Sequence, residues 1–503
     1  MRDLLVGIDI GTGGCKITVI DNRGDIIYEG TKEIKAYKLR PGWEEQDPDD
    51  WYDSVGASLK QALLSGSFGP EEIRGIGIDA STHNAVLLDS DWEILRKSIM
   101  WTDQRSAKEA EFLSEEFGKE IYEITFHYPK PTWTLPQLLW VKNNEPEVFE
   151  QIRHVMFTKD YIVWKLTNNW STDLTDGQGS LLVDMRERDW SKRMCDIASI
   201  SPEVLPPIKN KTEIVGKVTD RASRETGLRS GIPVITGTSD TAAEYYSVGA
   251  IDPGDSVVKL ATAGVVSVFD SQPHPTPISF TYTSVIPEIW YHCMGTNSAA
   301  SSLKWYKDVF IGPSDNGRDR NIYAEIDKEA SQVTPGSDGL IFHPYLMGER
   351  SPYWDPNLRA SFTGISAYHS RGHFSRSIME GVAFSIKDCM SSIEELGIPT
   401  NQVKMVGGGS KSKLWQKILA EVLGKPLTKL VSEDASFGSA MLAGVGTGVF
   451  GSLRAAVEQC VRIENEIVPD EKNVENYERC FGKYKSIHDN LEGIYREDQG
   501  SLV

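Results

Sequence analysis

Asp9 and the glycines that follow it have the chemistry needed to handle a phosphate group. The segment Asp9-Ile-Gly11-Thr12-Gly13-Gly14 ends a run of apolar residues, as a buried strand that stops in a tight turn would. Glycines let backbone amides approach phosphate oxygens closely, and a carboxylate beside them can hold a hydrated magnesium ion. The sequence therefore predicts a phosphate-binding turn at Gly11, Thr12 and Gly13, with Asp9 at the metal.

Two later segments contain turns of the same kind. LATAG (260–264) places Thr262 and Gly264 between two predicted strands, and VGGGSKSKLW (406–415) places three glycines between a strand and an amphipathic helix. A helix N-terminus with a bare glycine backbone suits a nucleotide. Any one of these turns also fits an ordinary hairpin glycine. The P-loop pattern is missing from the sequence, which disfavours that nucleotide fold.

Asp240 is the third candidate for chemistry. It ends an apolar strand in PVITGTSDTAAEYYSVGA (233–250), at the kind of strand-to-helix turn where open α/β folds expose side chains to a ligand. Acidic residues before helices often serve only as caps. Here Thr241-Ala-Ala-Glu244 fits a capping box that would satisfy the free amides by itself. We therefore expect Asp240 to be left for chemistry.

Composition restricts the classes of partner. The 503-residue chain has a net charge of −19 and a pI near 5.0, which argues against nucleic acid or an anionic membrane and favours a small molecule. The six cysteines form no C-x-x-C pair, so neither a disulfide framework nor a zinc site is indicated. The N-terminus lacks the apolar core of a signal peptide, and no stretch approaches the roughly 18 apolar residues of a membrane span. We expect a cytoplasmic protein.

The two halves of the chain repeat one pattern. Residues 4–30 read as three strands joined by tight turns, and SVVKLATAGVVSVFDS repeats the first turn with Thr262 placed 250 positions after Thr12. A predicted helix that leads to a strand then follows in each half. These features predict an α/β protein of two domains related by duplication, 1–248 and 249–503, with a cleft between them.

With these turns in order, the chain resembles the FGGY family of carbohydrate kinases, and most nearly its xylulokinase-like members. The similarity extends from about residue 4 to 450. The matching stretches include GIDIGTGGCK, GWEEQDPDDWY, STHNAVLLD, SIMWTDQRS, TDLTDGQGSLLVD, GTSDTAAEYYSVGAIDPGD, GERSPYWDPNLRASFTGIS and VGGGSKSKLWQKILAEVLGKPL.

The resemblance implies two actin-like (ribonuclease H-like) domains and transfer of the γ-phosphoryl group of ATP, with Mg²⁺, to a sugar hydroxyl. It implies that Asp240 is the catalytic aspartate, which accepts the hydroxyl proton, and that Asp9 is the metal-associated aspartate. The first domain would bind the sugar and the second the nucleotide. The positions implied for phosphate or nucleotide are Gly11, Thr12, Gly13, Thr262, Gly264, Gly407, Gly408, Ser412 and Gly438.

The resemblance also implies a sugar site in the first half. His83 matches a histidine of the xylulokinase-type pattern, and Asp103 matches a similarly placed acidic residue that could instead form a structural ion pair. Two substitutions depart from that pattern. Ser81-Thr82 replaces Gln-Met, and Thr241 replaces the Asn that usually follows the catalytic aspartate. Both positions would lie near the sugar, so a xylulose-like ketopentose is the first candidate substrate, with gluconate, ribulose and other polyols as alternatives.

A protein of another class also fits the sequence. A non-catalytic sensor would keep the fold and bind sugar or nucleotide without turnover, because a fold alone does not establish activity. The presence of Asp9, Thr12 and Asp240 favours the kinase. The sequence does not determine the oligomeric state, and a homodimer is possible, as dimers are common among such kinases.

Overall fold

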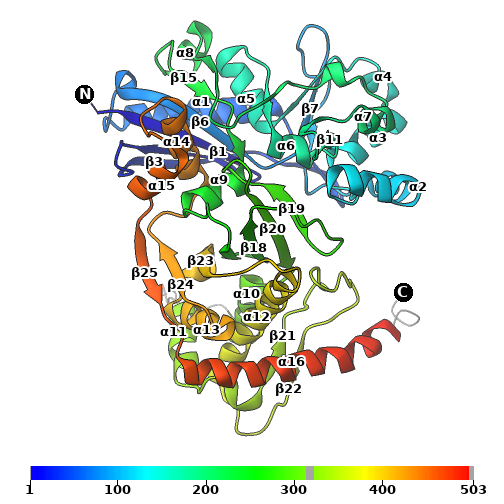
Figure 1. The fold of residues 1–503 in the computed structure, drawn as a ribbon, viewed down its shortest axis with the longest axis vertical. Coiled ribbons are helices and arrows are strands. Elements are labelled where there is room, and N and C mark those ends of the chain that lie inside the picture. Colours follow the sequence, from blue (N-terminus) through cyan, green and yellow to red (C-terminus); the bar gives the residue numbers. More distant parts are fainter. Residues whose placement is uncertain (1, 313–321, 498–503) are drawn as a thin grey trace. The chain divides into compact units, whose positions relative to one another are not determined.

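The computed structural model describes residues 2–312 and 322–497, which divide into two compact units (Figure 1). The first unit comprises the described part of Met1–Ile251, together with Tyr282–Glu288 and Ser432–Val461. The second comprises the described parts of Asp252–Thr281, Ile289–Val431 and Arg462–Val503. The second unit thus differs from the expected 249–503 domain, because two of the later segments pack with the first unit.

The first unit is built on a mixed sheet whose path runs β14-β15-β6-β1-β2-β3. The β1–β2, β2–β3 and β14–β15 pairs are antiparallel, whereas β1–β6 and β6–β15 are parallel. The short strand β16 also pairs in parallel with β6. The strands are β1 (Leu4–Gly11), β2 (Gly14–Ile20), β3 (Ile26–Glu33), β6 (Ile73–Ala80), β14 (Ile214–Lys217), β15 (Pro233–Ile235) and β16 (Thr238–Ser239).

The second sheet repeats this topology, in the order β20-β18-β17-β23-β24-β25, with β19 (Phe280–Thr283) beyond β20. The β17–β18, β18–β20 and β24–β25 pairs are antiparallel, and β17–β23 and β23–β24 are parallel. Order and direction therefore match the first sheet strand by strand, as duplication predicts. The strands are β17 (Asp255–Leu260), β18 (Gly264–Asp270), β20 (Trp290–Thr296), β23 (Gln402–Val406), β24 (Leu427–Leu430) and β25 (Ile463–Ile467).

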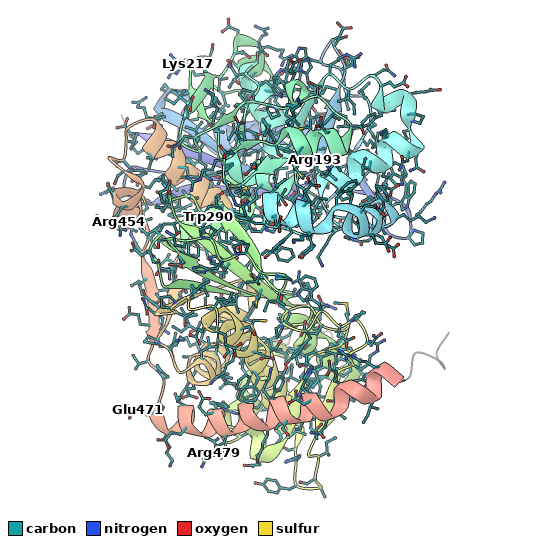
Figure 2. All side chains as sticks on the ribbon, turned by 45° about the vertical axis from the view of Figure 1, so that its right-hand side comes forward. Arg193, Lys217, Trp290, Arg454, Glu471 and Arg479 are labelled. Carbon is teal, nitrogen blue, oxygen red and sulfur yellow. The ribbon has the colours of Figure 1, made fainter. Side chains whose placement is uncertain are left out.

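Helices cover the sheets in each unit, and each unit has apolar cores of its own. The principal helices of the first unit are α1 (Pro48–Leu64), α2 (Ala107–Thr125), α3 (Thr134–Asn144), α5 (Thr158–Thr167), α6 (Leu174–Gly179), α7 (Lys192–Ala198), α8 (Asp220–Thr226), α9 (Asp240–Ser247), α14 (Ala435–Gly446) and α15 (Leu453–Cys460). Those of the second are α10 (Ala300–Tyr306), α11 (Ile322–Ser331), α12 (Arg371–Glu394), α13 (Lys413–Leu423) and α16 (Glu471–Glu497), on which Figure 2 labels Glu471 and Arg479. No helix in residues 2–312 and 322–497 is long and apolar enough to cross a bilayer.

Helix α14 comes from late in the chain and lies against β1, β6 and α9 (Figure 1). Glycines make this close approach possible. A Cβ at Gly7 would lie 1.7 Å from the Ser436 carbonyl oxygen, and one at Gly77 would lie 2.1 Å from that of Ser439. Because no side chain fits there, the backbone of α14 can rest directly on the two central strands.

Candidate active site

Three aspartates lie at neighbouring strand ends of the first sheet. Asp9 on β1 is the register partner of Asp79 on β6. On the other side of β6, Thr238 of β16 pairs with Asp79, and Asp240 follows this short strand as the first residue of α9. Asp79 was missed by the sequence analysis. A single carboxylate inside the otherwise apolar strand GIGIDA was the signal that could have found it.

Burial and mutual repulsion raise the pKa values of this carboxylate pair. The pKa of Asp9 rises to about 7, mainly through burial, with added repulsion from Asp240 and Asp434. The pKa of Asp79 is raised well above its usual value by complete burial and by Asp9, although a hydrogen bond from the Ser439 hydroxyl, 2.6 Å away, opposes the rise. The raised pKa values mean that the pair resists full ionisation by itself, and a bound cation would favour its ionised form.

Asp240 does not cap its helix. The cap is Ser239, whose hydroxyl accepts from the amide of Ala242, so the predicted capping box at Thr241 and Glu244 is wrong. Instead, the amide and hydroxyl of Thr241 both donate to Asp240 Oδ1, at 2.5 and 3.1 Å. Ser239 was overlooked because Thr241 fits the capping pattern equally well. The expectation that another residue caps the helix is nevertheless confirmed.

A buried ionic network holds the strand that precedes Asp240. Lys159 Nζ lies 2.6, 3.1 and 3.0 Å from carboxylate oxygens of Asp160, Asp173 and Asp176, and all four side chains are at most 2% exposed. Asp173 also accepts a hydrogen bond from the Thr238 hydroxyl at 3.0 Å. The network thereby fixes β16, and with it the position of Asp240.

His83 lies in an aromatic cluster of the first unit. Its ring centroid is 4.8 Å from that of Trp133, which stacks on His127, and the His127 ring lies 4.7 Å from that of Tyr282. Burial lowers the pKa of His83 to about 4, against the opposing effect of a hydrogen bond to the backbone of Thr132. Its Nδ1 is buried and has no partner among the described residues. His83 is therefore neutral at physiological pH, and its Nδ1 can accept a hydrogen bond.

Asp103 is an ion-pair partner inside the first unit. Its Oδ1 accepts from the amide and Nε of Arg105, and its Oδ2 accepts from Arg105 Nη2 and the amide of Glu44, at 2.6 to 3.0 Å. Each oxygen already accepts two hydrogen bonds and the side chain is buried, so the ion-pair alternative replaces the predicted contact with a sugar hydroxyl. Thr82, by contrast, is half-buried in the turn after β6 and immediately precedes His83.

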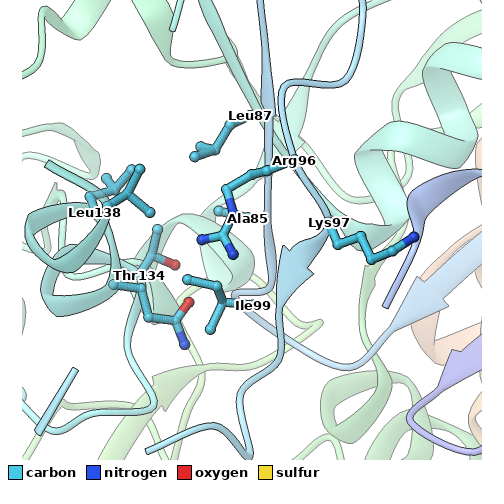
Figure 3. A pocket seen from close by; sticks show the side chains of 9 residues that line it. Ala85, Leu87, Arg96, Lys97, Ile99, Thr134 and Leu138 are labelled. Atoms are coloured by element: carbon cyan, nitrogen blue, oxygen red, sulfur yellow. The ribbon is translucent and has the colours of Figure 1, made fainter. Parts of the chain in front are cut away.

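A cavity near His83 is too small for a sugar. It is lined by side chains that include Arg96, Thr134 and Gln137 (Figure 3), and Thr134 donates to the carbonyl of His83. The space accommodates about one water molecule. Most of the lining side chains are apolar, but Arg96 Nη1 and Gln137 Oε1 have no hydrogen-bond partner among the described residues and could bind that water. The cavity is therefore a small internal space behind His83 and is not the ligand site.

The first glycine turn is open where a phosphate would approach. A Cβ added at Gly13 would meet no atom within 4 Å, whereas one at Gly11 would make ordinary contacts. The Thr12 hydroxyl accepts from the indole of Trp101 at 3.0 Å, and its carbonyl accepts from Gln46. Packing thus explains the orientation of Thr12 but gives no reason for glycine at position 13.

The glycines in the turns of the second unit are also of two kinds, crowded and open. A Cβ at Gly264 would collide with Thr296 and Ile386, and one at Gly407 with the backbone of Leu260. A Cβ at Gly408 would meet no atom within 4 Å. The Thr262 carbonyl accepts from the amide of Ala299. As predicted, α13 buries Ile418 and Val422 on one face, and Ser412 caps it by accepting from the amide of Trp415.

Gly438, the last of the predicted nucleotide positions, lies in α14 of the first unit, where a Cβ would be 2.0 Å from the Ala243 carbonyl oxygen.

The carboxylate of Asp9 could bind a magnesium ion whose remaining ligands come from elsewhere. Asp9 Oδ1 is buried and has no hydrogen-bond partner within the described chain. Among residues 2–312 and 322–497, no group of three or more Asp, Glu, His or Cys side chains could hold a metal alone. Magnesium is commonly bound by one or two carboxylates, with waters and substrate phosphates supplying the remaining ligands. The donor set therefore suits a metal that arrives with a nucleotide.

The comparisons with known proteins agree with this arrangement. Residues 4–245 match the N-terminal domain model of the FGGY family of carbohydrate kinases, and residues 258–447 match its C-terminal domain model. The chain is 30% identical over 495 residues to a xylulose kinase from Lactococcus lactis, covering 97% of each chain. It is 25% identical over 505 residues to a gluconokinase from Bacillus subtilis, covering 99% of this chain and 98% of the relative.

A solved structure gives the same result. The crystal structure of a xyloylose kinase from Brucella ovis superposes with a TM-score of 0.89 at 29% identity and covers 98% of this chain and 100% of its own. Two family models match in the expected order, and the similarity to the relatives extends over nearly their whole length. The chain therefore belongs to the FGGY family of carbohydrate kinases.

Proposed function

We propose that this carbohydrate kinase uses Mg²⁺ and ATP to phosphorylate a hydroxyl of a ketopentose of the xylulose type. The observation that carries the proposal is the carboxylate Asp240 at the start of α9, next to the strand ends that carry Asp9 and Asp79. The full-length similarity to xylulose kinases supports the choice of sugar.

Asp240 would accept the proton of the sugar hydroxyl as its oxygen attacks the γ-phosphorus. The hydrogen bonds from Thr241 hold one carboxylate oxygen in place, which orients the group toward the substrate. Asp9 would hold the magnesium ion, which neutralises charge on the phosphate oxygens. Gly13 and Gly408 would offer backbone amides to the phosphates, and Thr12, Thr262 and Ser412 would lie beside them.

His83 would bind a sugar hydroxyl through Nδ1, with Thr82 and Thr241 beside it. The buried rings of Trp133 and His127, which stack on each other, would support the His83 ring from behind. Gluconate is a second candidate because of the similarity to a gluconokinase along the whole chain, and ribulose is a third. The threonines at positions 82 and 241 are polar side chains that would contact whichever sugar binds.

Release of ADP with a panel of sugars tests the proposal. The panel contains D-xylulose, L-xylulose, D-ribulose, gluconate and glycerol, and each is scored by kcat/KM in the presence of Mg²⁺. We expect the highest value for a ketopentose. A highest value for gluconate would change the substrate class, and tight sugar binding without any ADP release would identify a sensor.

We also propose that the protein acts in the cytoplasm, where ATP is available. A homodimer remains a prediction, and sedimentation of the full-length protein would test it.

A further inference from the structure

We propose that Asp79 is a second carboxylate ligand of the divalent cation that Asp9 holds. This inference rests on the proposed function, because it concerns the metal of the same reaction. It assigns a chemical role to a residue that no sequence motif singled out.

The sheet register places the two carboxyl groups together. Asp9 and Asp79 are partners in the parallel β1–β6 ladder, and side chains at paired positions of neighbouring strands lie on the same face of a sheet. Each lies one or two residues before its strand ends, at Gly11 and Ala80. Their side chains interact directly. Two oxygens from adjacent strands are therefore available at one point.

Asp79 has a buried oxygen without a partner. The residue is 0% exposed, and its Oδ2 accepts from the Ser439 hydroxyl at 2.6 Å, but its Oδ1 has no hydrogen-bond partner among the described residues. Asp9 Oδ1 is also buried and also has no hydrogen-bond partner among the described residues. A buried carboxylate oxygen without a donor costs substantial free energy. A cation between the two oxygens would satisfy both.

The charged side chains that act most strongly on the pair do not supply that cation. They are the carboxylates of Asp240, Asp434 and Glu244. Lys16 is engaged elsewhere, 2.9 Å from Asp434 and 3.1 Å from Glu29. Oxygen ligands of this kind suit magnesium or manganese.

Helix α14 orients Asp79 for this role. Gly77, two residues earlier on β6, leaves room for the backbone of Ser439, and the Ser439 hydroxyl fixes one oxygen of Asp79. The other oxygen is left for the metal. Ser439 is thus a positioning residue, since it would act through Asp79 and need not touch the ion.

Binding of Mn²⁺ to the full-length protein tests the inference. Free Mn²⁺ is measured by electron paramagnetic resonance, with and without ADP, for the wild type and for Asp9→Asn, Asp79→Asn and Asp434→Asn. We expect Asp9→Asn and Asp79→Asn each to weaken binding at least about tenfold. Asp434 caps α14 and pairs with Lys16, and Asp434→Asn keeps a good helix cap while it removes the charge and the ion pair, so it should change the affinity by less than about threefold.

Thermal melting separates a metal ligand from a purely structural residue. Without metal, Asp79→Asn should melt no lower than the wild type, because burial disfavours a charge at this position and Asn carries none, and Mn²⁺ should then raise its melting temperature less. Wild-type Mn²⁺ affinity in Asp79→Asn, or no Mn²⁺ binding by the wild type even with ADP, would overturn the inference. Neither measurement involves a sugar, so a failure of the proposed sugar kinase activity would show separately, in the ADP-release panel.

Discussion

Asp173 accepts a hydrogen bond from the hydroxyl of Thr238, 3.0 Å away and two residues before Asp240. Asp173 also caps α6 and pairs with Lys159, so one buried carboxylate joins a helix, an ammonium group and the strand that leads to the proposed base. The placement of Asp240 therefore depends on the charge balance of this network.

The network predicts unequal effects of two matched substitutions. Burial raises the pKa of Asp176 well above its usual value against the opposing effect of Lys159, which favours the neutral form, so the neutral and similarly shaped Asn is a mild replacement. For Asp173, burial is outweighed by Lys159 and Lys211, which lower the pKa and keep the group ionised. We expect Asp173→Asn to cost about 3–5 kcal/mol of unfolding free energy and Asp176→Asn about 1 or less. Denaturant titration measures both, and equal losses would contradict this account of the network.

Substitution of Gly13 or Gly408, where an added Cβ meets no atom, should weaken nucleotide binding without lowering the stability of the fold. A methyl group at Gly13 or Gly408 meets no protein atom within 4 Å, so Gly13→Ala and Gly408→Ala should melt like the wild type but bind ADP more weakly. Gly438→Ala is the contrasting control, because its Cβ would collide with Ala243 and cost about 1–3 kcal/mol. If calorimetry gave the wild-type ADP affinity for both Gly13→Ala and Gly408→Ala, the proposal that these turns contact the phosphates would be contradicted.

His83→Ala should raise the KM for the sugar and leave the KM for ATP nearly unchanged. The pKa of the buried ring, lowered to about 4, keeps His83 neutral above pH 5, so the sugar KM should not titrate with this group between pH 6 and 8. The unfolded chain binds more protons between pH 4 and 6.5, so the contribution of His83 to stability is full above that window and is lost as the pH falls through it.

Initial-rate kinetics and pH-dependent melting of both proteins check this prediction. The fall in melting temperature from pH 6.5 to 5 should be smaller in His83→Ala than in the wild type. An equal rise in both KM values would move His83 out of the sugar site.

The sequence predicted the repeated strand–turn–strand units and the amphipathic helix α13, because these features follow from local periodicity and turn residues. It did not predict that α14 packs on the first sheet, since that contact joins Ser436 and Ser439 to glycines more than 350 residues earlier in the chain. Asp79 was missed for the same reason: its pairing with Asp9 is set by the register of two strands distant in sequence. For Asp103 the contacts favour the ion-pair alternative over the sugar contact, because Arg105 and the amide of Glu44 donate to both of its oxygens.

The turnover of Asp240→Asn tests the central claim most directly. The substitution keeps the size of the side chain and an oxygen that can accept from Thr241, but it removes the proton acceptor. Sugar-dependent ADP release, measured with the best substrate of the panel, should fall at least about a hundredfold in kcat. ADP affinity and melting temperature should stay close to those of the wild type. A folded Asp240→Asn protein that phosphorylates the sugar at a near-normal rate would contradict the assignment of Asp240 as the base.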